Sequence, residues 1–198
     1  MFSWVANFLA SLFAKNSSCK SYIEVYPFRV LSKEAVEKLM SKMPLFWYNT
    51  SGKKKVLVVV IFTEDQDYSN YGKRLVKFIV ENYPEYKIGL FFSDIPDPGN
   101  KDKNFRSKVV AFYCKAEKSI EDFFNLEKLS NSCPDEKYEV LEKEIEEKES
   151  LLYSLANYRI SFPVIILEDG RMYCLEIYRS FPIEDVLCKI FSQEKQSA

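Results

Sequence analysis

Histidine is absent from this 198-residue chain, and that absence excludes more chemistry than any other feature of its composition. Without an imidazole there can be no Ser-His-Asp or Cys-His relay, no HExxH zinc protease and no metal shell that contains histidine. General acid or base catalysis would therefore depend on Asp, Glu, Lys, Tyr or Cys.

Glycine is also scarce, with five residues in the chain. Their spacing excludes a GxGxxG dinucleotide-binding turn, and the lysine run after Gly52 lacks the earlier glycine of a P-loop. Neither sign of charge is in excess, because the formal net charge is −1, and this gives no general attraction to nucleic acid. We therefore expect no cofactor, no metal site and no nucleic-acid partner.

The five cysteines include no C-x-x-C pair, which is the spacing of a redox dithiol or a zinc knuckle. Because their number is odd, at least one thiol stays unpaired or joins another molecule. Cys174 and Cys188 lie in apolar segments and are expected to be small buried hydrophobes, not a reactive pair. Cys19 is expected to be a free thiol.

Residues 1–14 predict an amphipathic helix, because Trp4, Phe8 and Leu12 recur at helical spacing with small polar residues on the opposite side. The segment is too short to span a bilayer and lacks the positive start of a secretory signal. Three interpretations stay open: a helix that docks on a membrane surface or partner, an atypical signal peptide, and a helix packed on the protein's own core. Residues 1–19 are accordingly separated from a domain over residues 20–198.

Alternating elements follow and predict an α/β domain. In chain order, we expect a strand over 22–26, a helix from the N-cap Ser32 to Met43, and strands over 56–62 and 88–92 flanking a helix to about 82. Helices over 107–116, 119–129 and 135–157 follow, then a hairpin of strands over 162–167 and 172–178, and a helix over 183–191. This order predicts a thioredoxin-like three-layer fold, whose mixed central sheet has a helical insertion at about 105–157 between the βαβ and ββα halves.

Over residues 54–191 the sequence resembles bacterial disulfide isomerases of the DsbC/DsbG type, and three landmarks carry the resemblance. After the strand that ends Val60-Ile61-Phe62-Thr63-Glu64, the run Ser69-Asn70-Tyr71-Gly72 is similar to the family's redox motif, with Ser69 and Gly72 in place of its two cysteines. Cys114 and Cys133 bracket a helix as the family's structural disulfide does. Phe162-Pro163, followed by the turn at Asp169-Gly170, resembles the family's cis-proline strand and hairpin.

The resemblance implies a Cys114–Cys133 disulfide, a cis bond before Pro163 and a degenerate active site at residues 69–72 without catalytic residues. Because both redox cysteines are missing, isomerase activity is not implied. We expect Ser69 to cap the helix that follows. An extended peptide could pair with the Phe162–Pro163 strand by strand addition, and a purely structural proline is the alternative. The first fifty residues do not match the family's dimerisation domain, so no oligomeric state is predicted.

These features favour a redox-inactive binding, chaperone-like or assembly protein of a membrane-associated complex, with a protein or peptide partner. One alternative is a thiol–disulfide oxidoreductase that works through a single cysteine, Cys174 or Cys19. The other, less favoured, is a metal-dependent phosphatase with an Asp-x-Asp motif at Asp65 and Asp67. A disulfide favours an extracytoplasmic compartment, the periplasm or cell envelope, and the cytoplasm of a thermophile is the alternative.

Overall fold

The structure is a computed structural model that describes residues 23–44, 46–62, 66–94, 103–130, 132–155 and 160–194. Its internal contacts divide the chain into two compact units. The larger is Pro27–Ile177, and the smaller combines the two chain ends, of which residues 23–26 and 178–194 are described. The predicted N-terminal helix and the free thiol of Cys19 lie outside the described residues.

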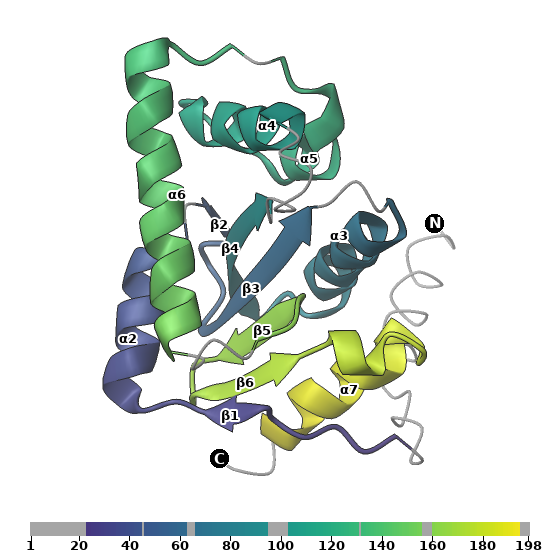
Figure 1. Cartoon of the computed structure of the whole chain (residues 1–198). Helices are drawn as coiled ribbons and strands as arrows, with labels where there is room; N and C mark the ends of the chain where they lie inside the picture. Colours follow the sequence, from purple (N-terminus) through teal and green to yellow (C-terminus); the bar gives the residue numbers. More distant parts are fainter. Residues whose placement is uncertain are drawn as a thin grey trace, which may run out of the picture. The chain divides into compact units, whose positions relative to one another are not determined.

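A six-stranded sheet forms the centre of the larger unit (Figure 1). In spatial order its strands are β1 (Arg29–Val30), β6 (Arg171–Cys174), β5 (Val164–Leu167), β3 (Lys54–Phe62), β4 (Tyr86–Asp94) and β2 (Phe46–Tyr48). β3 and β4 are parallel, whereas the other neighbouring strands are antiparallel. The inner order β6-β5-β3-β4, with a helix crossing from β3 to β4, is that of a thioredoxin-like α/β fold, as the sequence predicts.

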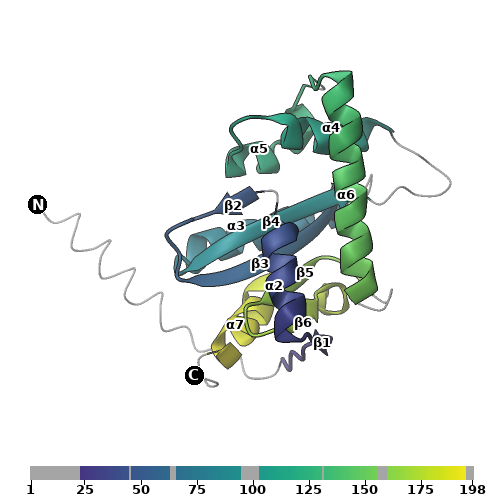
Figure 2. The same ribbon diagram turned by 90° about the vertical axis from the view of Figure 1, so that its left-hand side faces the viewer.

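Helices cover both faces of this sheet (Figures 1 and 2). α3 (Gln66–Asn82) lies on one face, and α2 (Lys33–Lys42) and α6 (Asp135–Leu155) lie on the other. The predicted helical insertion between the two halves is confirmed. It begins with α4 (Lys103–Cys114), α5 (Ile120–Phe124) and the 3-10 helix η1 (Leu126–Lys128), which lie over the end of the sheet toward which β3 runs (Figure 1), and it closes with α6.

β3 is the centre of the core, and its composition explains why. Residues 56–62 are all apolar, with five β-branched side chains, and every one of them is buried. A strand covered on both faces reads as a continuous apolar run instead of an alternating one. The prediction of a central strand over these residues is confirmed.

Local signals set several element boundaries. The hydroxyl of Ser32 accepts a hydrogen bond from the Ala35 amide at 3.3 Å and caps α2, which ends before Pro44 as predicted. Gly170 has φ +93° in the turn between β5 and β6, and a Cβ there would lie 2.6 Å from the Leu31 carbonyl oxygen. Glycine is therefore required both by the backbone conformation and by the close approach.

Three features of the strands differ from the prediction. No strand forms over residues 23–26, because side chains take the backbone groups: Gln193 Nε2 donates to the Val25 carbonyl at 3.0 Å, and the Tyr26 amide donates to Tyr178 Oη at 3.1 Å. The edge strand β2 was not predicted, because three residues are too few to show a period. β6 ends at Cys174, and the chain turns into the 3-10 helix η2 (Glu176–Tyr178).

The smaller unit contributes α7 (Ile183–Glu194), the predicted last helix. Within the described ranges, no helix has both the length and the apolar character needed to cross a membrane.

Candidate functional site

The run that resembles the redox motif lies inside α3, not at its start. α3 begins at Gln66, so Ser69 is its fourth residue, and only 7% of Ser69 is exposed. The expectation that Ser69 caps the helix is therefore wrong, because a capping residue precedes the first helical turn. The physical reason is that residues 66–68 extend the helix by almost a turn beyond the start that the motif suggests.

Gly72 marks the closest approach of α3 to the sheet. A Cβ added at Gly72 would overlap Cγ1 of Val60 in β3. Because valine has little freedom at χ1, a side chain at position 72 would force the helix and the strand apart. The second position of the motif is thus a packing contact and offers no room for a thiol.

Pro163 directly precedes β5, at the end of its ladder with β3. The Phe162–Pro163 peptide bond is cis. Val164 pairs with Val59 at the end of the antiparallel β3–β5 ladder, so Pro163 and Val60 are the next residues beyond that last pair. The topology therefore brings the motif-like run and the proline together at one end of β3.

Phe162 and Pro163 are largely covered by contacts within the protein. The Pro163 carbonyl accepts a hydrogen bond from the Leu175 amide at 2.8 Å. Phe162 is buried, and its ring centroid lies 6.1 Å from that of Tyr153 in α6. The carbonyl of Pro163 is thus committed to the protein's own sheet.

The insertion covers the end of β3 with an aromatic side chain. Phe123 of α5 is fully buried, and its ring centroid lies 5.6 Å from that of Phe62 and 5.2 Å from that of Phe92. Beside it, Nζ of Lys73 in α3 forms an ion pair with Oε2 of Glu127 at 2.6 Å. The same ammonium lies 5.7 Å from the Phe62 ring centroid. α5 and η1 thus close over the position where the motif-like run meets the strand.

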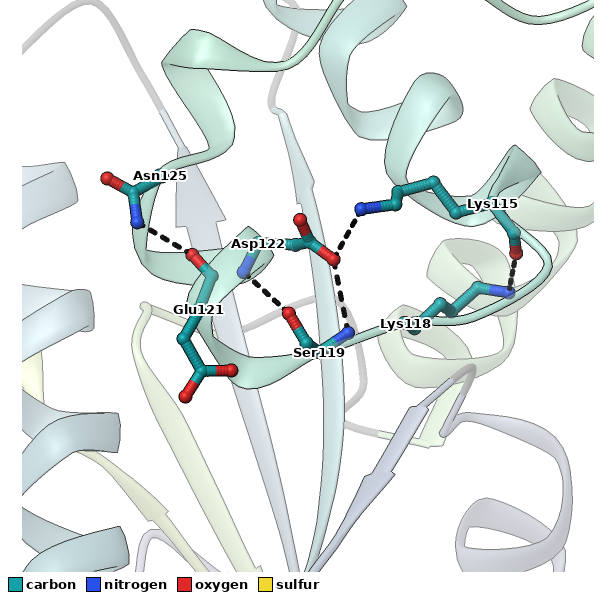
Figure 3. Close-up of polar contacts among 6 residues, drawn as sticks. All are labelled: Lys115, Lys118, Ser119, Glu121, Asp122 and Asn125. Carbon is teal, nitrogen blue, oxygen red and sulfur yellow. Dashed lines mark hydrogen bonds and ion pairs between the residues drawn. The ribbon is translucent and has the colours of Figure 1, made fainter.

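α5 is a single turn that carries its own capping box (Figure 3). The Ser119 hydroxyl accepts from the Asp122 amide at 3.1 Å, and the Asp122 carboxylate accepts from the Ser119 amide at 3.2 Å. Lys115 Nζ lies 2.6 Å from the same carboxylate, and its hydrogen bond is the main reason why the pKa of Asp122 is lowered. Lys118 donates to the Lys115 carbonyl at 2.8 Å and closes the preceding turn.

The predicted Cys114–Cys133 disulfide is confirmed, with the two Cα atoms 5.8 Å apart. It joins the end of α4 to the residues that precede α6. Next to it in sequence, the Tyr113 hydroxyl donates to the Phe92 carbonyl at 2.5 Å and accepts from the Phe92 amide at 3.1 Å. These bonds replace strand pairing, because the β2 ladder on β4 ends at Leu90. Burial raises the pKa of Tyr113, so this phenol stays protonated.

The other cysteines do not form a reactive pair. Cys174 is buried as predicted, and burial raises the pKa of its thiol although hydrogen bonds with Ser161 oppose the shift. Cys188 is disulfide-bonded, so its expected role as a reduced core residue is wrong; sequence spacing alone does not reveal pairing. Asp67 is exposed in the first turn of α3, and Asp65 lies outside the described residues. Among the residues that can be placed, no three potential ligands gather as a metal site would require.

The Lys73–Glu127 pair predicts a pH-dependent contribution to stability. Partial burial is the largest single influence and would raise the pKa of Glu127, but the hydrogen bond from Lys73, a backbone hydrogen bond and the charges of Lys73 and Lys128 together outweigh it and lower the pKa below 4.5. A carboxyl whose pKa is lowered by folding stabilises the fold above its unfolded pKa, and this stabilisation is lost as the pH falls through the folded pKa. Glu127→Gln should therefore lower the free energy of unfolding at pH 7 by up to about 1 kcal/mol.

This difference should shrink toward zero as urea titrations are repeated at successively lower pH below 4.5. Glu81→Gln is the matched control, because Glu81 pairs with Lys77 at 3.9 Å on the exposed face of the same helix and should have no measurable effect. A Glu127→Gln effect that is equal at pH 7 and at acid pH would show that the ion pair is not its cause.

The chain is similar in structure to a solved thioredoxin-like domain. The crystal structure of the Trx3 domain of UGGT, in its detergent-unbound form, matches with a TM-score of 0.41 and 18% sequence identity over 75% of this chain and 95% of that chain. No protein-family model matches the sequence, and neither does any curated protein. The strand order and the helical crossover give the chain a thioredoxin-like α/β fold.

Proposed function

We propose that this protein is a redox-inactive thioredoxin-like protein that binds another protein and acts as a chaperone-like or assembly component. The observation that carries the proposal is the closed motif position, where Ser69 is buried within α3 and Gly72 packs on Val60. Thiol–disulfide exchange needs an accessible thiolate, best placed at a helix N-terminus. Cys174, buried and with a raised pKa, does not meet that need.

A lineage shared with the DsbC/DsbG type is part of this proposal. It is supported by the order of the landmarks along one fold: the motif-like run after β3, a disulfide within the helical insertion, and the proline strand before the β5–β6 hairpin. The chain also departs from that type, because the motif-like run lacks both cysteines and begins further inside its helix.

Within this proposal, the partner is an extended protein segment that pairs with an edge of the sheet. Strand addition at Phe162–Pro163 would compete with the bond that the Pro163 carbonyl already makes. In contrast, β1 is an edge of the sheet among the described strands. Val30 in β1 is 64% exposed, and Phe28, which directly precedes the strand, is 46% exposed. Edge strands with exposed apolar side chains are sites of β-augmentation.

The location of the protein is also proposed. The Cys114–Cys133 disulfide and the disulfide-bonded state of Cys188 favour an oxidising compartment such as the periplasm or cell envelope, and the cytoplasm of a thermophile is the alternative. Docking to a membrane or a larger complex through residues 1–14 rests on the amphipathic pattern of the sequence. Mass-spectrometric mapping of the cysteines in protein isolated from its host tests the oxidised state directly.

Insulin precipitation in the presence of a dithiol distinguishes binding from catalysis in one assay. A reductase brings forward the onset of turbidity, whereas a binder of extended chains delays it. We expect the full-length protein to delay the onset, because the described residues hold no accessible thiolate in the oxidised protein and include apolar side chains exposed at a sheet edge. Cys174→Ser should behave as the wild type, and Val30→Lys should shorten the delay because it places a charge on that edge.

Two other results would change this proposal. Faster precipitation that Cys174→Ser abolishes would replace the binding proposal with a single-cysteine oxidoreductase. A delay that Val30→Lys leaves unchanged would retain binding but remove β1 as its site.

A further inference from the structure

The segment that covers the end of β3 is too small to hold its own structure. We call residues 115–130 the cover segment; its secondary structure is the five-residue α5 and the three-residue η1. Isolated helices of this length do not persist in water. The position of the cover segment therefore depends on contacts with the rest of the unit.

Those contacts are few and specific. Phe123 and Leu126 are fully buried, and Phe123 packs on Phe62 and Phe92. Nζ of Lys108 in α4 donates to the carbonyls of Glu127 at 2.6 Å and Leu129 at 3.0 Å. The Lys73–Glu127 ion pair links η1 to α3. Because this pair is partly exposed, it contributes at most about 1 kcal/mol to stability.

A covalent bond ties the two ends of the cover segment together. Cys114 ends α4, and Cys133 lies two residues before α6. The first buried residue of α6 is Ile145, so residues 135–144 add no buried side chain of their own. Besides the disulfide, Lys137 Nζ donates to the Cys114 carbonyl at 2.8 Å. The first turns of α6 lie beside α4 in Figure 1, and the disulfide ties them to α4 covalently.

We propose that the Cys114–Cys133 disulfide is a redox-controlled fastening of the cover segment, and that its reduction uncovers the aromatic end of β3 and β4. Both cysteine residues are partly exposed. A dithiol donor attacks one sulfur and forms a mixed disulfide, and its second thiol then displaces the protein thiol. The S–S bond of the protein breaks, Cys114 and Cys133 become thiols, and the donor is oxidised to its disulfide by two electrons.

Reduction acts through chain entropy. In the oxidised protein, the disulfide still closes the loop when the cover segment has left the sheet, and the start of α6 stays fixed to α4. In the reduced protein, the first ten residues of α6 are released with it, so the open state gains many more conformations. The surface then exposed, formed by Phe62 and Phe92, suits an apolar segment with one aromatic side chain in the place of Phe123. This fastening does not depend on the function proposed above.

Hydrogen exchange of the full chain tests the proposal. In Cys114→Ser/Cys133→Ser, the disulfide of Cys188 is retained, and exchange in residues 115–130 and 135–144 should accelerate about 10-fold or more, while β3 keeps its protection. Binding of the apolar dye ANS should increase in parallel. Cys174→Ser is the matched control and should change neither signal.

Two outcomes would overturn the proposal. One is exchange in residues 115–130 that matches the oxidised wild type; the other is acceleration that extends equally through β3, which would make the disulfide a staple of the whole fold. Should the double variant fail to fold, Cys114→Ala/Cys133→Ala, which also retains the disulfide of Cys188, gives the same measurement. If that protein also unfolds, the proposal is refuted.

Discussion

Replacing Phe123 with alanine is expected to lower the free energy of unfolding of the oxidised protein by about 3–5 kcal/mol. Phe123 is fully buried, and its edge-to-face contacts with Phe62 and Phe92 join α5 to two strands of the central sheet. The loss combines the transfer of the ring to water with the cavity left between the rings. Urea unfolding followed by fluorescence and by circular dichroism measures it.

Phe28→Ala is the matched control, because Phe28 is 46% exposed and its truncation should cost less than about 1 kcal/mol. The size of the Phe123→Ala effect also depends on the disulfide. Once the cover segment is open, Phe123 contributes nothing further, so the effect cannot exceed the free energy of opening. In Cys114→Ser/Cys133→Ser, where opening is easier, the same substitution should therefore cost less. Equal effects in the two backgrounds would show that Phe123 and the disulfide stabilise the fold independently.

Much of the fold could be predicted because strong local signals agree with the tertiary structure. The apolar run at 56–62 permits only a buried strand, and Ser32 and Pro44 mark the ends of α2 chemically. Ile23 and Val25 show the limit of such signals: both are buried with an exposed residue between them, which is the pattern of a strand. Their segment forms no ladder because Gln193, far away in sequence, bonds to its backbone.

The candidate site was predicted less well, because it depends on where one helix begins. The run Ser69 to Gly72 resembles a motif at a helix start, but nothing in residues 66–68 breaks a helix, and α3 extends back through them. The place of Phe123 is also a matter of long-range packing. An aromatic pair in a short segment bounded by two cysteines was the available signal, and it did not show which surface the aromatic residue covers.

A double variant tests whether the motif position can support redox chemistry at all. Ser69→Cys/Gly72→Cys restores the C-x-x-C spacing, yet we expect its insulin-reduction rate to stay within about 2-fold of the dithiol background, because exchange requires an accessible thiolate. The position of Ser69 is buried in the helix interior, and a side chain at 72 overlaps Val60.

Measurements of stability separate the two causes of the expected lack of turnover, which are the burial of residue 69 and the overlap at position 72. Gly72→Cys gains only about 0.3 kcal/mol in helix propensity but loses about 1–3 kcal/mol to overpacking, so a net loss is expected. Adding Val60→Ala removes the atom that the new Cβ would meet and should recover part of that loss without restoring turnover, because residue 69 stays a turn inside α3. If the triple variant instead reduced insulin efficiently, residues 66–68 would have to unwind in solution, and the motif position would be an active site that lacks only its sulfurs.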